Sequence, residues 1–241
     1  MKYLDCTFPT PAENLAWEEA YLDQCEAGSA DELLRFYESP KPFAVLGYAN
    51  KVRSEVDVGM CSAQHVGVFR RISGGGTVLQ GPGCLSYALF LRIGACSELS
   101  SITGTNQFIM EQNRSTLAKL TQLPVQVQGH TDLAIEARKF SGNAQRRKKS
   151  FVLFHGTVMF AMDIPSISRF LRMPSLEPEY RSGRRHEDFL MNLPVSRSSI
   201  LESFIAKWDA RATLTNPIPR VAQDLMDTYN SNEWIYRGEE S

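Results

Sequence analysis

The chain has 241 residues, of which 43% are hydrophobic and 22% charged, a composition typical of a globular protein with one large or two small domains. Its 27 acidic residues nearly cancel its 26 basic ones, which excludes a net field that would hold the whole chain to nucleic acid or to an anionic membrane. The N-terminus reaches proline and acidic residues before any long apolar stretch forms, and no run of about 18 apolar residues follows, so neither a secretory signal nor a membrane span is predicted.

The five cysteines are odd in number and include no Cys-x-x-Cys pair. This spacing argues against a disulfide framework or a structural zinc site, and it is typical of proteins kept in a reducing cytosol. We therefore expect a cytoplasmic protein without a bound metal.

The first part of the chain is predicted to contain a helix, two strands and a second, short helix. Residues 12–26 carry apolar side chains at helical spacing, and Gly28 follows as a helix stop. Two β-rich runs, 33–37 and 43–48, are separated by a turn with two prolines and are expected to pair as a hairpin. Residues 54–65 are expected to form the short helix.

Glycine-rich turns divide the next part of the chain. Three strands are predicted at 66–71, 76–80 and 85–91. Residues 102–120 have apolar side chains at helical positions and predict a long helix, and 125–128 alternate with period two, as a half-buried strand does.

A long β-hairpin is predicted over residues 132–163. Its first strand leads through the basic turn Arg146–Lys149 into a strongly apolar second strand. We expect Gly142 and Gly156 to bend the pair, since glycine inside a strand often marks a bulge.

The C-terminal third is predicted to be mainly helical. Ser199 and Glu202 fit a capping box, and Pro219 opens a last helix that runs through Leu225. The proline-rich segment 172–188 is expected to be a mobile loop. Together, these elements predict an α+β fold with a central mixed β-sheet and flanking helices.

The segment Arg70–Gly76 places two arginines before three consecutive glycines. Glycine allows positive φ and lets backbone N–H groups approach an anionic ligand closely. Arg70 and Arg71 are neighbours on a strand, so their side chains point to opposite faces and only one can face a ligand directly. The glycines by themselves favour a tight hairpin turn, and neither a GxGxxG fingerprint nor a P-loop is present.

Two later clusters also contain groups that suit an acyl or phosphate ligand. Lys139 precedes a turn with Ser141 and Gly142, where its ammonium can stabilise developing negative charge. For a lone lysine, a solvated surface position is the far more usual interpretation. His155 and Gly156 lie inside an apolar strand, where a satisfied structural histidine and a bulge are the more usual interpretations.

The order of these clusters is specific even though each alone is weak. The chain has Arg-Arg-x-Ser-Gly-Gly-Gly-Thr-Val, then Asp-Leu, Lys-x-Ser-Gly-x-Ala and His-Gly-Thr, within residues 33–163. This series resembles the lipoate-protein ligase and octanoyltransferase superfamily, which also includes biotin protein ligases, although their Gly-Arg-Gly-Arg pattern is missing here. The resemblance implies a biotin/lipoate ligase-like catalytic domain over residues 1–241, without an accessory C-terminal domain.

The resemblance also implies roles for the matched residues. Lys139 is implied to be catalytic, in contact with the acyl carbonyl and the α-phosphate. The residues implied to bind substrate and adenylate are Arg70, Arg71, Ser73, Gly74, Gly75, Gly76, Ser141, Gly142, Ala144, His155 and Gly156.

An ATP-dependent lipoate-protein ligase is the activity that the resemblance implies first. Lipoate or octanoate would attack the α-phosphorus of Mg²⁺-ATP, and a lysine of a 2-oxoacid dehydrogenase lipoyl domain or of the glycine-cleavage H protein would then take the acyl group. The alternatives are an ATP-independent octanoyl or lipoyl transferase that uses a cysteine thioester, and a lipoyl-adenylate-binding protein with little turnover. No nucleic acid or membrane partner is expected.

Several positions depart from the family pattern. Residues 80–81 are Gln-Gly in place of His-Asp, Cys84 replaces a common asparagine, and Tyr48 replaces a common arginine. The last cysteine is Cys96, so Cys84 is the one candidate nucleophile, and a small buried residue is its simpler interpretation. Without an accessory domain, a separate accessory protein is a further expected partner. The basic turn Arg146–Lys149 is either solvated or a docking patch for an acidic acceptor.

Overall fold

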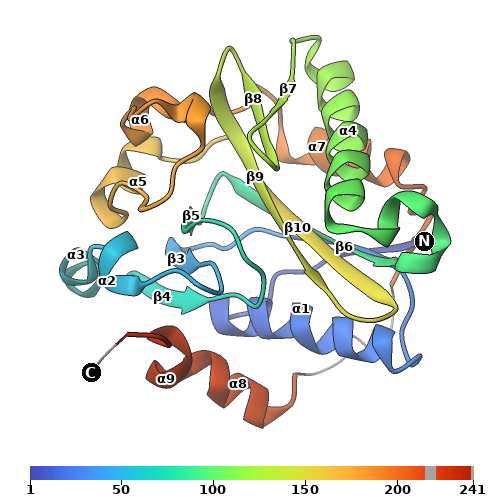
Figure 1. The fold of residues 1–241 in the computed structure, drawn as a ribbon, viewed down its shortest axis with the longest axis horizontal. Coiled ribbons are helices and arrows are strands. Elements are labelled where there is room, and N and C mark those ends of the chain that lie inside the picture. The colour runs from blue at the N-terminus through green and yellow to red at the C-terminus, as the bar shows by residue number, and fades with distance from the viewer. Residues whose placement is uncertain (215–220, 240–241) are drawn as a thin grey trace.

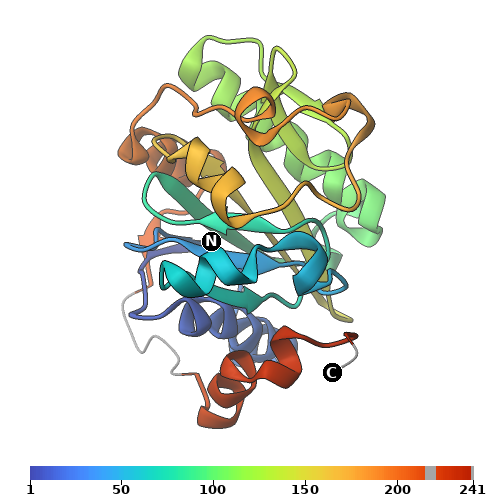
Figure 2. The same cartoon turned by 90° about the vertical axis from the view of Figure 1, so that its left-hand side faces the viewer.

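The computed structural model describes residues 1–214 and 221–239. It contains a larger and a smaller β-sheet with helices packed around them (Figures 1 and 2). The larger sheet has the order β11-β1-β2-β6-β10-β9-β8-β7, with β1 Lys2–Asp5, β2 Leu33–Tyr37, β6 Cys84–Arg92, β7 Gln126–Gln128, β8 Asp132–Ile135, β9 Arg138–Arg147, β10 Phe151–Met159 and β11 Ala212–Thr213. The smaller sheet has the order β4-β3-β5, with β3 Phe43–Leu46, β4 Gly67–Arg70 and β5 Val78–Gln80.

Both sheets are mixed. Strand β1 pairs in parallel with β2 and β11, whereas β2, β6, β10 and β9 pair antiparallel with their neighbours. Strand β3 is parallel to β4 and antiparallel to β5. The predicted α+β class with a mixed sheet is therefore confirmed.

The helices pack against both sheets. They are α1 Pro11–Glu26, α2 Val52–Glu55, α3 Val58–Ala63, α4 Ile102–Thr121, α5 Ile164–Phe170, α6 His186–Phe189, α7 Arg197–Lys207, α8 Gln223–Asn230 and α9 Asn232–Ile235, with short 3₁₀ turns η1 Ile93–Ala95, η2 Ser97–Ser100 and η3 Glu179–Arg181. Helices α1 and α8 lie on one face of the larger sheet, α4 and α7 on the other, and the remaining helices lie beside the smaller sheet. Among the described residues, no helix has the length and apolar character needed to cross a bilayer.

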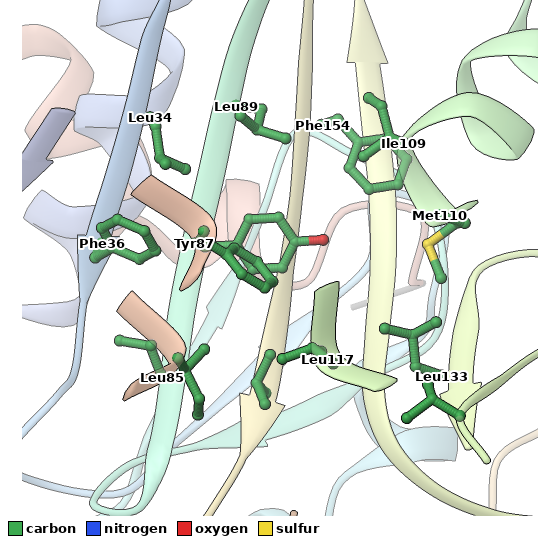
Figure 3. Close-up of a cluster of buried hydrophobic side chains, with 14 of the residues drawn as sticks. Leu34, Phe36, Leu85, Tyr87, Leu89, Ile109, Met110, Leu117, Leu133 and Phe154 are labelled. Atoms are coloured by element: carbon green, nitrogen blue, oxygen red, sulfur yellow. The ribbon is translucent and has the colours of Figure 1, made fainter. Parts of the chain in front are cut away.

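Side chains from β2 and β6 fill two separate cores. Leu34 and Leu89 pack toward α4 and α7 (Figure 3), whereas their chain neighbours Leu33 and Phe90 pack toward α1. Successive side chains of a strand point to opposite faces, so a strand covered on both faces is a continuous apolar run in the sequence.

Helix α1 begins where the sequence predicts. Pro11 occupies its first turn, and the Thr10 side chain accepts a hydrogen bond from the Glu13 backbone N–H at 3.1 Å. The helix buries one side against the sheet, and this side includes Glu18. An acidic side chain is thereby brought into the interior of the protein.

The predicted hairpin of residues 33–48 is wrong. Strand β2 lies between β1 and β6 in the larger sheet, whereas β3 is the central strand of the smaller sheet. The proline-containing turn between them therefore carries the chain from one sheet to the other. The hairpin expected from the three glycines is also absent, because β3 separates β4 from β5.

The hairpin predicted over residues 132–163 is confirmed for β9 and β10, with the basic turn at its tip. Its expected first strand is divided, because residues 132–135 form the separate strand β8, which pairs antiparallel with β9. Gly156 does not mark a bulge, because it pairs in regular register with Asn143 and Tyr87. The irregular register lies instead between Leu133 and Ala134 of β8. The glycine at position 156 therefore needs a different explanation, which the site provides.

One predicted helix start differs from the structure, and a second lies outside the described residues. The N-cap of α7 is Ser196, whose side chain accepts a hydrogen bond from the Ser199 N–H, so the helix starts earlier than a Ser199 cap allows. Pro219 lies outside the described residues, and the described helix nearest to it is α8. Segment 172–188 contains η3 and reaches into α6, and its mobility stays a prediction.

Candidate functional site

Two cavities meet between the β8–β10 strands and the smaller sheet, with volumes of about 470 Å³ and 90 Å³. Lys139 and Gly142 of β9 line both of them. The other residues shared by the two cavities are Thr77, Val78, Thr157, Pro174, Arg181 and Phe189. The two cavities are thus adjacent, and Lys139 belongs to the wall that they share.

The Lys139 ammonium is held at this shared wall by Asp132. Its Nζ lies 2.8 Å from Asp132 Oδ1, and the Tyr180 hydroxyl donates to Oδ2 of the same carboxylate at 2.9 Å. Burial and the nearby Asp132 raise the pKa of Tyr180, so its hydroxyl stays protonated and donates. A Cβ added to Gly142 would lie 2.8 Å from Lys139 Nζ. Glycine at 142 therefore leaves the room that the lysine needs.

Arg71 fixes the glycine loop, residues 73–77, from inside the protein. Its Nη2 donates to the carbonyls of Gly74 and Gly76 at 2.6 and 2.8 Å, and its Nε donates to Ser73 Oγ at 3.0 Å. Burial lowers the pKa of Arg71 to about 10, so the guanidinium remains charged at neutral pH. Gly75 has a φ of 87°, a conformation that favours glycine.

His155 connects this loop to helix α1. Its Nδ1 lies 2.6 Å from Glu18 Oε2, and its Nε2 lies 2.6 Å from Ser73 Oγ. Glu18 also lies 3.8 Å from the buried guanidinium of Arg35. His155 and Glu18 both line the larger cavity. Both ring nitrogens of His155 therefore have hydrogen-bond partners, as expected of a structural histidine, and its side chain is also part of the cavity wall.

Arg70 points away from both cavities, as the strand geometry predicts for the neighbour of Arg71. Its guanidinium donates hydrogen bonds to backbone carbonyls of the loop after β3 and of helix α9, at Gly47, Tyr48, Asn50, Trp234 and Ile235. The Trp234 indole N–H donates in return to the Arg70 carbonyl at 2.9 Å. Arg70 thus ties two distant segments together behind the glycine loop.

The other predicted binding residues divide in the same way. The larger cavity is lined by Gly75, Gly76, Gly142, Ala144, His155 and Gly156. Ser73 and Ser141 are 1% exposed and do not line either cavity, and Gly74 contributes the carbonyl that Arg71 binds. Together with Arg71, seven of the predicted binding residues therefore line the larger cavity, and the other four, Arg70, Ser73, Gly74 and Ser141, line neither cavity.

Gly156 makes room for a polar side chain of β9. A Cβ at position 156 would lie 1.8 Å from Asn143 Oδ1. That oxygen accepts a hydrogen bond from the Tyr87 hydroxyl at 2.5 Å, and Asn143 Nδ2 donates to the Thr131 carbonyl at 2.7 Å. The close approach of Asn143 explains the glycine that a bulge does not.

Cys84 lines the smaller cavity but is poorly suited to act as a nucleophile. It is 2% exposed, and burial raises the pKa of its thiol to about 12. The thiolate, which is the reactive form, is therefore scarce at neutral pH. The other cysteines, Cys6, Cys25, Cys61 and Cys96, line neither cavity. Within the described residues, no group of three or more His, Cys, Asp or Glu side chains is arranged to hold a metal.

The smaller cavity is mainly apolar, with one polar side. Its apolar wall comes from Leu79, Met159, Ile167, Leu171, Phe189 and Leu190. Segment 172–188 adds Arg172, Arg181 and His186 to the wall, and Glu55 holds this segment by accepting hydrogen bonds from the backbone and side chain of Ser175. Burial lowers the pKa of His186, which keeps this imidazole neutral.

Sequence reasoning missed Glu18, Asn143 and Arg181, and it gave no role to Asp132. Asp132 could have been predicted, because the Asp-Leu pair belongs to the series of motifs that resembles the family. Glu18 could not, because Glu19 beside it has the same chemistry and the helical pattern does not separate them.

The fold is that of lipoate-protein ligase catalytic domains. A crystal structure of lipoate-protein ligase A bound with ATP has a TM-score of 0.83 at 22% identity, covering 98% of each chain. A bipartite lipoate protein ligase from Thermoplasma acidophilum has a TM-score of 0.79 at 21% identity, covering 100% of this chain and 97% of the other.

Sequence comparison gives the family. The chain belongs to the lipoyl protein ligase A/B catalytic domain family, whose sequence model matches residues 10–193. Among curated relatives, "Octanoyltransferase LipM" of Carboxydothermus hydrogenoformans is 28% identical over 272 residues, covering 98% of both chains. "Probable lipoate-protein ligase A" of Mycoplasma pneumoniae is 28% identical over 163 residues, covering 68% of this chain and 46% of the relative.

Proposed function

We propose that this protein is a lipoate-protein ligase that activates lipoate or octanoate with Mg²⁺-ATP and transfers the acyl group to a lysine of a lipoyl domain or H protein. The observation that carries the proposal is Lys139, which lines both cavities. An acyl-adenylate has an apolar chain on one side of its mixed anhydride and a nucleotide on the other. Two adjacent cavities with a cation in their shared wall suit such a molecule.

The proposed reaction has two steps, adenylation of the acyl group and its transfer to the acceptor. The acyl carboxylate attacks the α-phosphorus of ATP, a new C(O)O–P bond forms and pyrophosphate leaves. The acceptor amine then attacks the acyl carbon, AMP leaves, and the amine loses a proton to solvent as the amide forms. Lys139 would stabilise negative charge on the phosphate in the first step and on the acyl oxygen in the second. The glycine loop would wall the reacting group from water.

A second candidate is an octanoyl or lipoyl transferase that takes a preformed acyl thioester. The LipM relatives favour it, because their printed name is octanoyltransferase and they match the chain over nearly its full length. The chemistry of the site favours the ligase, since Cys84 is the one cysteine that lines a cavity and its pKa of about 12 suppresses the thiolate. A lipoyl-adenylate-binding protein with little turnover is the third candidate.

The basic turn is a weaker docking surface for an acidic acceptor than its sequence indicates. Arg147 donates to the Leu99 carbonyl and to Thr105 Oγ1, and Lys148 pairs with Asp23. Both side chains therefore already have intramolecular partners. An acceptor that docks here would meet Arg146 and Lys149 as the exposed members of the turn.

Pyrophosphate exchange separates the candidates. The ligase predicts incorporation of labelled pyrophosphate into ATP that depends on lipoate or octanoate, followed by amide formation on a lipoyl domain. The transferase predicts no exchange but modification of the domain from an octanoyl thioester. Tight retention of lipoyl-AMP without modification of the domain would identify the third candidate. We further propose that the protein is a single cytoplasmic domain. If activity appears only when a separate accessory protein is present, that protein is a partner in the reaction.

A further inference from the structure

A buried chain of hydrogen bonds runs from helix α1 to the glycine loop. It begins at Glu18, which is 2% exposed and whose carboxylate can only accept a hydrogen bond when ionised. His155 Nδ1 lies 2.6 Å from Glu18 Oε2, so Nδ1 carries the proton in this contact. The other ring nitrogen, Nε2, is thereby directed at Ser73 Oγ, 2.6 Å away.

The chain continues from Ser73 to the backbone of the loop. Ser73 Oγ accepts the Arg71 Nε–H at 3.0 Å, and the same guanidinium donates to the Gly74 and Gly76 carbonyls at 2.6 and 2.8 Å. Gly75 lies between these two carbonyls and lines the larger cavity. Three successive hydrogen bonds therefore connect His155, through Ser73 and Arg71, to the loop carbonyls on either side of Gly75.

The order of serine, histidine and carboxylate is the one found in hydrolytic triads, but the geometry here excludes a nucleophilic serine. Ser73 is 1% exposed, it does not line either cavity, and its oxygen already receives the Arg71 N–H. The hydroxyl holds two neighbours in place and has no path to a substrate carbonyl.

We propose that Glu18 is a positioning residue that sets the glycine loop for the acyl substrate, and that it acts through His155. Two further features support this role. First, the Glu18 carboxylate lies close to the buried guanidinium of Arg35. Second, burial lowers the pKa of Arg71, and the negative charge of Glu18 acts in the opposite direction and favours the charged guanidinium. The part that concerns the substrate rests on the proposed function, whereas the part that concerns the loop does not.

The chain offers a matched control for this proposal. Glu19 is the next residue of α1, and its carboxylate accepts a hydrogen bond from the Tyr229 hydroxyl at 2.7 Å. It does not line either cavity. Glu19→Leu therefore removes a hydrogen-bonded carboxylate from the same helix without touching His155.

Nitrogen-15 NMR of the full chain tests the effect on the loop without any assumption about activity. Glu18→Leu should shift the backbone amides of residues 74–76 and remove the protonated Nδ1 signature of His155. Glu18→Gln, whose amide oxygen still accepts the Nδ1 proton, and Glu19→Leu should leave both unchanged. Unchanged glycine amides in Glu18→Leu would overturn the proposal. If Glu18→Leu does not fold, His155→Gln must shift the same amides while the contact of Glu18 with Arg35 persists, and unshifted amides in that variant would overturn the proposal equally.

Steady-state kinetics with octanoate and a lipoyl domain test the effect on the substrate. Glu18→Leu should raise KM for octanoate by about tenfold or more and change kcat by less than about threefold, whereas Glu18→Gln should largely restore KM. The double variant Glu18→Leu/His155→Leu should match His155→Leu within about twofold, because both act on one pathway. If the two single-variant effects on KM multiply in the double variant, the proposed shared pathway is contradicted. If the unsubstituted chain transfers no acyl group, the proposed function fails, and the NMR result still decides the role of Glu18.

Discussion

Replacing Gly156 with alanine tests how the β9–β10 hairpin builds the cavity wall. The new Cβ would lie 1.8 Å from Asn143 Oδ1 and 2.8 Å from the Gly142 carbonyl oxygen, far inside van der Waals contact. Asn143 must then move and give up its bonds with the Tyr87 hydroxyl and the Thr131 carbonyl. Each lost buried bond costs about 1–3 kcal/mol, so we expect a total loss of about 3 kcal/mol in the free energy of unfolding.

Thermal denaturation measures this loss directly. For a chain of this size about 3 kcal/mol corresponds to a fall in Tm of roughly 6–12 °C. Gly94→Ala is the matched control, because a Cβ at position 94 meets nothing within 4 Å, and its Tm should stay within about 2 °C of the unsubstituted chain. A Gly156→Ala variant as stable as the Gly94 control would refute the explanation of this glycine.

Three further substitutions test other parts of the site. Arg70→Met removes the donor shared by several buried carbonyls, and urea denaturation should show a loss of about 3–5 kcal/mol; a loss below about 1 kcal/mol would contradict its tying role. Cys84→Ala should keep the rate of acyl transfer within about threefold, since the protonated thiol is not a nucleophile, and complete loss in a folded variant would restore the cysteine mechanism. Asp132→Asn should slow single-turnover transfer by about tenfold or more because it loosens Lys139, and an unchanged rate would remove Asp132 from the site.

Local patterns in the sequence predicted the elements that form between residues close together in the chain. Helix α4 and the β9–β10 hairpin were found from side-chain periodicity and turn residues, and the opposite directions of Arg70 and Arg71 followed from the period of a strand. The partners of β2 and β3 were not predictable in this way, because their pairing joins segments distant in the chain and is decided by which apolar faces each strand buries.

The site was predicted in part for a similar reason. The clusters around Lys139 and the glycine loop were recognisable because they are short motifs, and both line the larger cavity. The functions of Gly156 and Glu18 depend on contacts with Asn143 and His155, which come from other strands or helices. No single short motif contains both members of either pair.

The most direct test of the central claim is the intact mass of a lipoyl domain after incubation with this protein, octanoate and Mg²⁺-ATP. Lys139 in the shared wall of the cavities should make the reaction possible, so the domain should gain one octanoyl group with the unsubstituted chain and none above background with a folded Lys139→Ala variant. Modification of the domain at the same rate by Lys139→Ala would contradict the account.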